Sequence, residues 1–126
     1  MISVVISLAL LSTDPITAAE VASALAQVRQ VREAMSREMP DYRSARFRDV
    51  YATAQGAHDE GRRAAYFCGR VSSPRRNGGD GWTAFVAVEG VVKFEDLEDG
   101  KMFVDDMCGP TDPRDTVDRA ALLQAR

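Results

Sequence analysis

Few residues of this chain could carry reaction chemistry. The only histidine, His58, excludes metal sites built from several histidines. Its place in a polar turn is typical of a solvated side chain rather than of a catalytic Ser-His-Asp or Cys-His set. Cys68 lies inside a strand-like run, whereas a nucleophilic cysteine needs a neighbouring base and an electropositive pocket. We therefore predict no catalytic residue, no metal site and no cofactor, and we expect that the protein is not an enzyme.

A glycine-rich loop between two strand-like runs is the strongest candidate for binding. Two arginines precede Asn-Gly-Gly, and backbone amides beside guanidinium groups can hold a carboxylate or a phosphate. The loop is not a Walker loop, because the Gly-Lys-Ser/Thr end is missing. The alternative, which the sequence favours, is a hairpin turn whose glycines supply positive φ angles. The candidate binding residues are Arg75, Arg76, Asn77, Gly78, Gly79 and Trp82.

Acidic residues cluster around a second turn, Glu98-Asp99-Gly100. Paired carboxylates can perform acid–base catalysis or bind calcium, but Leu97 occupies a ligand position of the EF-hand order. The favoured interpretation is a solvated acidic edge beside a hairpin, which discourages aggregation of the sheet. The cluster comprises Glu95, Asp96, Glu98, Asp99, Asp105 and Asp106.

Three aromatic residues, Tyr66, Trp82 and Phe85, lie on neighbouring strand-like runs. We expect them to pack in the core. A patch that binds a partner is the alternative.

The two cysteines, Cys68 and Cys108, are 40 positions apart. This spacing excludes a CxxC redox motif and a zinc knuckle. An even pair indicates a disulfide in an exported chain and two reduced core thiols in a cytosolic one. The predicted disulfide therefore depends on export.

The N-terminal run Met1–Leu11 is apolar and suits a secretory signal with a cleavage site near Ala18. It is shorter than the roughly 20 residues of a membrane-spanning helix, so we predict no stable span. No Lys or Arg precedes it, and a buried strand or helix start is the alternative. We divide the chain into a signal-like segment, residues 1–18, and one domain, residues 19–126. The expected location is periplasmic or secreted, or cytoplasmic if the segment is retained and the cysteines are reduced.

Length and composition are those of a single globular domain. The chain has 126 residues, of which 45% are hydrophobic and 28% charged. The net charge of −3 argues against a general nucleic-acid binder. Basic residues concentrate in 29–76 and acidic residues in 77–126, so the two halves either pair in the fold or present oppositely charged faces.

Periodicity and turn signals predict an α+β domain. Apolar residues from Val21 to Met39 recur at steps of three and four, which indicates one amphipathic helix that starts after Asp14 or Thr17 and stops at Pro40. This helix covers one face of an antiparallel meander of four to five strands. The polar stretch 41–48 is predicted as a turn. Strands are predicted over 50–54, 64–72, 82–88, 91–95 and 102–108, and a short C-terminal helix over 115–124.

Three short motifs resemble a group of small exported proteobacterial proteins, often lipoproteins or phage-associated. They are Ser-Ala-x-Phe at 44–47, Cys-Gly-x-Val at 68–71 and the Asn-Gly-Gly turn that starts at Asn77 and leads to Trp82 and Phe85. The resemblance covers residues 40–90 and implies an exported α+β domain, with no catalytic residue to carry over. The chain departs from the group at Asp80-Gly81, because the group has an aromatic residue before its last glycine where this chain has Asp80. It also lacks a lipoprotein cysteine near the N-terminus.

Three functional hypotheses remain open. The leading one is a non-enzymatic binding or interaction module of the bacterial cell envelope, which uses the Arg75–Trp82 loop to bind an unknown protein or envelope ligand and no nucleic acid. The second is a small hydrolase that uses the carboxylates of the acidic hairpin. The third is a phage-derived structural or accessory protein that assembles through a sheet edge.

Overall fold

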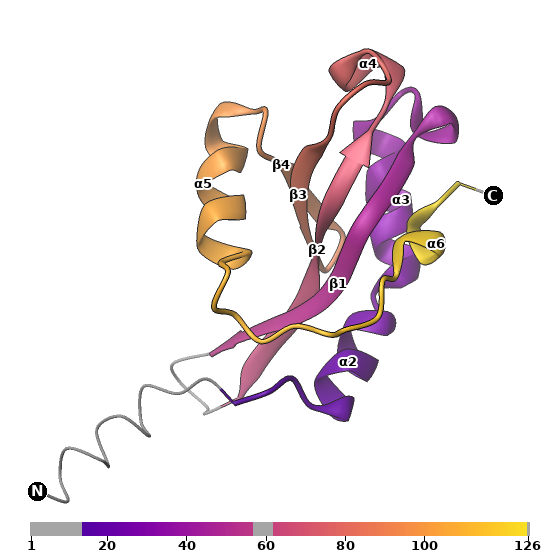
Figure 1. The fold of residues 1–126 in the computed structure, drawn as a ribbon. Helices are drawn as coiled ribbons and strands as arrows, with labels where there is room; N and C mark the ends of the chain where they lie inside the picture. The colour runs from indigo at the N-terminus through magenta and orange to yellow at the C-terminus, as the bar shows by residue number, and fades with distance from the viewer. Residues whose placement is uncertain (1–13, 57–61, 126) are drawn as a thin grey trace, which may run out of the picture.

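The computed structural model describes residues 14–56 and 62–125. Over these residues a four-stranded antiparallel sheet, in the order β1-β2-β3-β4, has helices on both faces (Figure 1). The α+β class, the antiparallel meander and the short C-terminal helix are confirmed. The strands are β1 Arg46–Gly56, β2 Arg63–Ser72, β3 Thr83–Val88 and β4 Val91–Phe94. The helices are α2 Ala18–Leu25, α3 Val28–Glu38, η1 Tyr42–Ser44, α4 Pro74–Asn77, α5 Glu98–Met107 and α6 Ala120–Leu123.

Some sequence predictions lie outside the described residues. These include residues 1–13 of the signal-like segment, and His58.

The single helix predicted up to Pro40 is in fact two helices, α2 and α3. Of the two predicted starts, Thr17 is the observed one: it forms a capping box with Glu20, in which the Thr17 hydroxyl accepts from the Glu20 N–H and the Glu20 carboxylate accepts from the Thr17 N–H. The helix is interrupted at Gln27. The Gln27 amide donates to the Ala65 carbonyl and accepts from the Glu89 N–H, both at 2.9 Å. The Gln27 side chain thus ties the helices to β2 and to the turn between β3 and β4.

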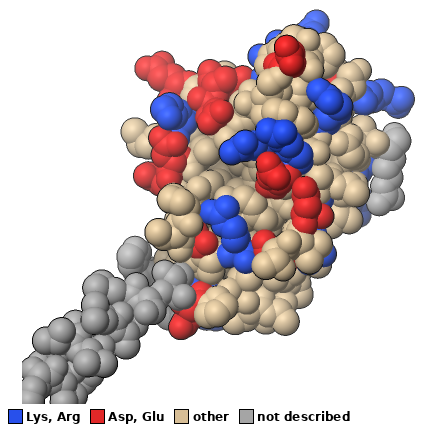
Figure 2. Space-filling model, in the orientation of Figure 1, with Lys and Arg blue, Asp and Glu red and all other residues tan. Residues whose placement is uncertain are grey.

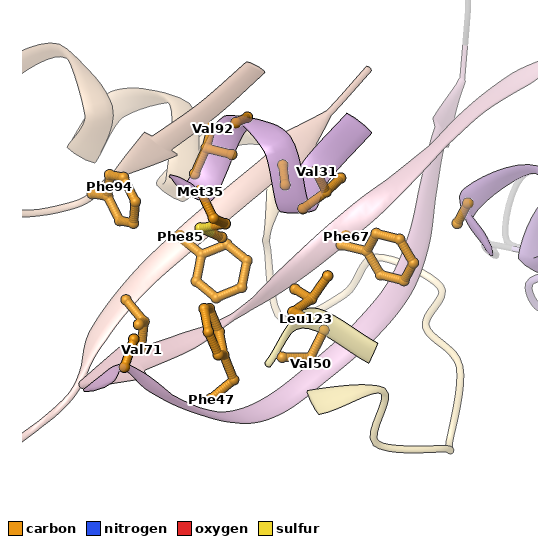
Figure 3. Packing of buried hydrophobic residues seen from close by; sticks show 14 of the residues in the cluster. Val31, Met35, Phe47, Val50, Phe67, Val71, Phe85, Val92, Phe94 and Leu123 are labelled. Atoms are coloured by element: carbon orange, nitrogen blue, oxygen red, sulfur yellow. The ribbon is translucent and has the colours of Figure 1, made fainter. Parts of the chain in front are cut away.

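The larger hydrophobic cluster joins buried residues of α2, α3 and α6 to one face of the sheet (Figure 3). Met35 and Leu123 have no exposed surface. The Phe47 and Phe85 rings meet edge to face with centroids 5.8 Å apart, and Phe94 lies 6.4 Å from Phe85. Each large apolar side chain buried in this way contributes about 1.5–3 kcal/mol relative to exposure, so this face supplies much of the stability of the fold.

Strand β1 starts earlier than predicted and contains a bulge. The predicted turn over 41–48 is correct only up to Ala45, because β1 begins at Arg46. The pairing of β1 with β2 shifts register between Arg48 and Tyr51, and Asp49 has a φ of 52°. The irregularity changes the alternation of faces, so that Phe47 and Val50, three positions apart, both join the core.

The prediction of a fifth strand over 102–108 is wrong, because residues 102–107 belong to α5 and Cys108 is its C-cap. The Asp-Gly pair read as a hairpin turn lies in the first turn of this helix. Gly100 is buried, and a Cβ there would lie 1.9 Å from the Phe94 carbonyl oxygen. The inward residues Val104, Met107 and Cys108 have the three-and-four spacing of a helix.

Residues 109–119, called here the strap, connect α5 to α6. In Figure 1 they run from α5 past the end of the sheet to β1. The Asp115 and Arg119 N–H groups donate to the Ala52 and Val50 carbonyls at 2.8 and 2.7 Å. The predicted C-terminal helix is therefore shorter than expected, because most of its first half is bound along β1.

Candidate functional site

The predicted binding loop folds into a compact internal structure. Ser73 caps the one-turn helix α4, which ends at Gly78 in the left-handed conformation. Gly79 and Gly81 also have positive φ, at 76° and 87°. The glycines therefore have the conformational role expected of a turn.

Two of the proposed binding side chains are used within the fold. The Asn77 carboxamide accepts from the Ser73 N–H at 3.0 Å and donates to the Thr83 hydroxyl at 3.2 Å. The Arg76 guanidinium lies 2.5 and 2.6 Å from the Asp96 carboxylate oxygens and 3.8 Å from the centre of the Phe94 ring. With 14% of its side chain exposed, Arg76 has a structural position.

Both arginines of the loop line a small hollow of about 200 Å³, together with the carboxylates of Glu38, Asp41 and Asp96. Arg75 is exposed, and its N–H donates to the Asp41 carboxylate at 2.8 Å. Burial acts to raise the pKa of Asp41, but hydrogen bonds from the Arg75 N–H and from Ser73 outweigh it and hold the pKa below its ordinary value. The three carboxylates that share the hollow with the arginines make it unsuited to an anion.

The Trp82 side chain contacts β1 rather than the rest of the loop. The Arg46 and Arg48 guanidinium groups lie 5.4 and 4.3 Å from the centre of its ring. Arg48 is directly opposite Arg70, and Arg70 is opposite Ala84, so these three side chains share one face of the sheet. We call Arg46, Arg48, Arg70 and Arg114, together with Trp82 and Tyr51, the arginine face.

The arginine face was missed by sequence reasoning. The alternation of Arg46 and Arg48 in an extended segment could have indicated a cationic strand face. The prediction of a turn over 41–48 conceals this pattern, because it treats Arg46 and Arg48 as loop residues. The expected aromatic cluster is also divided: Phe85 packs in the larger core, Tyr66 in a smaller cluster on the opposite face, and Trp82 beneath arginines.

A groove of about 530 Å³ lies on the same face, between α5 and the strap. Tyr51, Arg70 and Ala84 line it from the sheet, and Val104 lines it from α5. The strap contributes residues from Pro110 to Asp118. Figure 2 shows basic side chains over the centre of this view with acidic side chains next to them, and a separate acidic group at the upper left over α5.

The arginines of the groove have few partners within the protein. Arg114 donates to the Gly109 carbonyl at 3.1 Å and lies 4.3 Å from the centre of the Tyr51 ring. Among the described residues no carboxylate forms an ion pair with Arg70 or Arg114. Burial raises the pKa of Tyr51, and the nearby charges of Arg114 and Arg70 oppose this rise.

The carboxylates on the strap already have donors. Asp118 accepts from the N–H groups of Asp49, Val50 and Ala120 at 3.0, 3.1 and 2.9 Å. Asp115 accepts from the Arg119 guanidinium at 2.7 Å. Burial acts to raise the pKa of Asp115, but the hydrogen bonds from Arg119 and the backbone outweigh it, so the pKa is lowered.

A disulfide joins the floor of the groove to its wall. Cys68 of β2 is bonded to Cys108 at the end of α5, with an S–S distance of 1.99 Å. The predicted pairing is confirmed, and it leaves Cys68 without a free thiol. The buried Tyr66 hydroxyl donates to the Met107 carbonyl at 2.5 Å, and burial raises the pKa of this phenol strongly. The end of α5 is thus fixed to the sheet beside the groove.

The predicted acidic cluster is spread over the connection between β4 and α5 and the exposed surface of α5. Asp96 pairs with Arg76, while Asp99 and Asp105 approach Lys93 and Lys101 at 3.3 and 3.2 Å. Within 14–56 and 62–125, no group of three or more His, Cys, Asp or Glu side chains is placed to hold a metal ion. The cluster does not flank a hairpin, because the turn on which that prediction rested is helical.

Comparisons with family models, with curated proteins and with solved structures gave no match to this chain. Of the helices in the described ranges, none has both the length and the apolar character to cross a membrane.

Proposed function

We propose that the protein is a non-enzymatic binding module of the bacterial cell envelope that recognises an anionic partner through the arginine face. The observation that carries this proposal is the placement of Arg48 directly opposite Arg70 on an open sheet face, next to a groove. Like charges directly opposite each other on neighbouring strands are destabilising. A bound anion would turn this unfavourable pair into a favourable one.

The surroundings of these arginines suit recognition. The Arg48 guanidinium carbon lies 4.3 Å from the centre of the Trp82 ring, a cation–π contact that helps to hold the guanidinium on this face. A planar guanidinium can donate two parallel hydrogen bonds to one carboxylate, and arginine and tryptophan are enriched where proteins bind partners. The ion pair between Arg48 and Asp49 is long, at 3.6 Å, and half-exposed, so it competes weakly with a ligand.

The disulfide supports the proposed compartment. Disulfides between structural cysteines persist in oxidising compartments and are rare in the cytosol. Together with the signal-like apolar run at residues 1–18 and the resemblance to exported proteobacterial proteins, the bonded pair favours the periplasm or the exterior.

The alternative of a carboxylate-dependent hydrolase has no observation in its favour. Such an enzyme needs two carboxylates that face one substrate across a few ångströms. The acidic side chains named for it are spread along a solvent-facing surface, and three of them have basic neighbours.

Photo-crosslinking in cells that naturally make the protein tests the proposal. A photoreactive amino acid is placed at Thr116, which is exposed beside the groove, or at Ser36, which is exposed on α3. We expect a discrete adduct from position 116 alone. It should disappear in the variant Arg48→Glu/Arg70→Glu.

A matched double charge reversal away from the groove provides the control. Arg29 and Arg43 are exposed on α3 and η1, so Arg29→Glu/Arg43→Glu should leave the adduct intact. An adduct that is equal from both crosslinking positions, or equally sensitive to both reversals, would contradict the proposed binding face. Recovery of the protein from the cytoplasm with two free thiols would contradict the proposed compartment.

A further inference from the structure

The groove beside the arginine face has the size and the chemistry to select one class of ligand. Its volume of about 530 Å³ falls within the 300–1,000 Å³ usual for ligand sites. The floor carries a guanidinium, a phenol and a methyl group, from Arg70, Tyr51 and Ala84. The walls add apolar surface from Val104 and from Val117, which is 49% exposed.

The cationic positions of the groove have unused hydrogen-bond donors. Arg70 is exposed and has no carboxylate partner among the described residues. Arg114 uses one N–H on a backbone carbonyl and stacks on Tyr51, which leaves other N–H groups of its guanidinium unused. Arg114 lies 4.3 Å from the centre of the Tyr51 ring, and Tyr51 lines the same groove as Arg70.

The carboxylates of the groove limit the kind of anion that can enter. Asp115 accepts from the Arg119 guanidinium, whereas Asp118 accepts from uncharged backbone N–H groups, and Asp49 also lines the groove. Asp115 and Asp118 therefore keep negative charge on the strap wall, and Asp49 adds negative charge from β1. A chain of closely spaced phosphates would place charge against this wall, whereas isolated carboxylates separated by apolar groups would not.

The backbone of the neighbouring sheet edge is already occupied. The Val50 and Ala52 carbonyls of β1 accept from N–H groups of the strap. A ligand therefore cannot extend the sheet at this place by adding a strand, and it must be recognised mainly through its side chains.

We propose that the groove binds an extended peptide segment in which acidic and apolar residues alternate, with one side-chain carboxylate held between Arg70 and Arg114. Alternation places the carboxylates of an extended segment on one side and the apolar side chains on the other, so one side can meet Arg70 and Arg114 while the other packs on the apolar wall at Val104. This inference rests on the proposed function, because it names the partner of the same face.

Fluorescence anisotropy with defined peptides tests the inference on the disulfide-bonded protein. The probe is a fluorescein-labelled octapeptide in which glutamate alternates with leucine. The comparison ligands are the same peptide with glutamine for glutamate, and an oligothymidylate of equal charge. We expect the glutamate peptide to bind at least about tenfold more tightly than either, because charge-assisted hydrogen bonds are the stronger ones.

Variants locate the binding site. Arg70→Gln and Arg114→Gln should each weaken binding about tenfold, and Arg70→Lys should recover part of the loss, since it keeps the charge but not the planar fork. Arg29→Gln, on an exposed side chain of α3, should bind as the wild type does. Thermal unfolding of each variant identifies any that is misfolded.

The outcomes separate this inference from the proposed function. Equal binding of the glutamate and glutamine peptides, equal effects of Arg29→Gln and Arg70→Gln, or tighter binding of the oligonucleotide would overturn the peptide inference. If no peptide binds at 1 mM of protein, roughly the weakest affinity of interest, the inference also fails. The crosslinked adduct that depends on Arg48 and Arg70 would then still support the proposed function, and its loss as well would end both.

Discussion

The position of Gly100 gives the most direct test of how α5 is packed. In an exposed helix, replacing glycine by alanine stabilises by about 1 kcal/mol, because alanine has the better helix propensity. Here the added Cβ would lie 1.9 Å from the Phe94 carbonyl oxygen, whereas real Cβ contacts are essentially never shorter than 3.0 Å. The backbone of α5 or β4 would have to move by at least 1.1 Å (3.0 less 1.9).

The steric effect should exceed the gain in propensity. Overpacking of a buried site costs about 1–3 kcal/mol, and the upper end applies because the clash is with backbone rather than with a side chain that can rotate. Subtracting the gain of about 1 kcal/mol from a cost of about 3 leaves a net loss of about 2 kcal/mol for Gly100→Ala. With a urea m-value of about 2 kcal/mol per M, the midpoint should fall by about 1 M.

Urea unfolding, followed by circular dichroism and by the fluorescence of Trp82, measures this change. Gly56→Ala is the matched control, since Gly56 has no positive φ and no described atom within 4 Å of the added methyl group. It should change the midpoint little. If Gly100→Ala proves as stable as the wild type or more so, α5 does not pack on the end of β4 as described here.

Three further perturbations probe the rest of the fold. Replacing both cysteines by alanine should lower the free energy of unfolding by about 4 kcal/mol, the chain-entropy value for a separation of 40; a loss below about 1 kcal/mol in urea unfolding would contradict a bonded pair. Arg76→Ala should lower the free energy of unfolding by about 1–2 kcal/mol, because it removes the contact with the Phe94 ring and the ion-pair partner of Asp96. It should leave the crosslinked adduct intact, and loss of the adduct in a stably folded variant would show that the loop takes part in binding. The hydrogen bond from Arg63 lowers the pKa of the Glu20 carboxyl below its ordinary 4.5, so the stability that Glu20 contributes is complete above pH 4.5 and is lost as the pH falls through the pKa of the folded state. Between pH 5 and 3 the urea midpoint should fall less in Glu20→Gln than in the wild type, and parallel curves for the two proteins would refute this.

The sheet could be predicted because its strands have clear alternation and clear ends. In β2, strict alternation predicts Ala65, Phe67 and Val71 on one face and Tyr66 and Cys68 on the other, and the two hydrophobic clusters divide in this way. The pattern decides the outcome because a shift of one residue would turn every side chain of the strand to the wrong face.

The failures arose where a tertiary contact overrides a local pattern. An Asp-Gly pair is a strong hairpin signal, yet Gly100 is needed for the close approach of α5 to the Phe94 carbonyl. The break in the N-terminal helix depends on what the Gln27 side chain bonds 38 and 62 positions away. Neither distance in sequence is visible in a window of local periodicity.

The same reasoning explains why the candidate site moved from a loop to a sheet face. Glycine, asparagine and arginine in one short loop look like an anion site, but a loop of this size must first satisfy its own backbone, and Asn77 does this. A strand face has no such demand, because its backbone is satisfied by the neighbouring strands. Arg48 and Arg70 face each other across β1 and β2, and over the described residues Arg48 contacts the Trp82 ring and forms a long, half-exposed ion pair with Asp49. Under the proposed function, recognition uses these arginines of the regular sheet, whereas Arg76 of the glycine-rich loop stabilises the fold through Asp96 and Phe94.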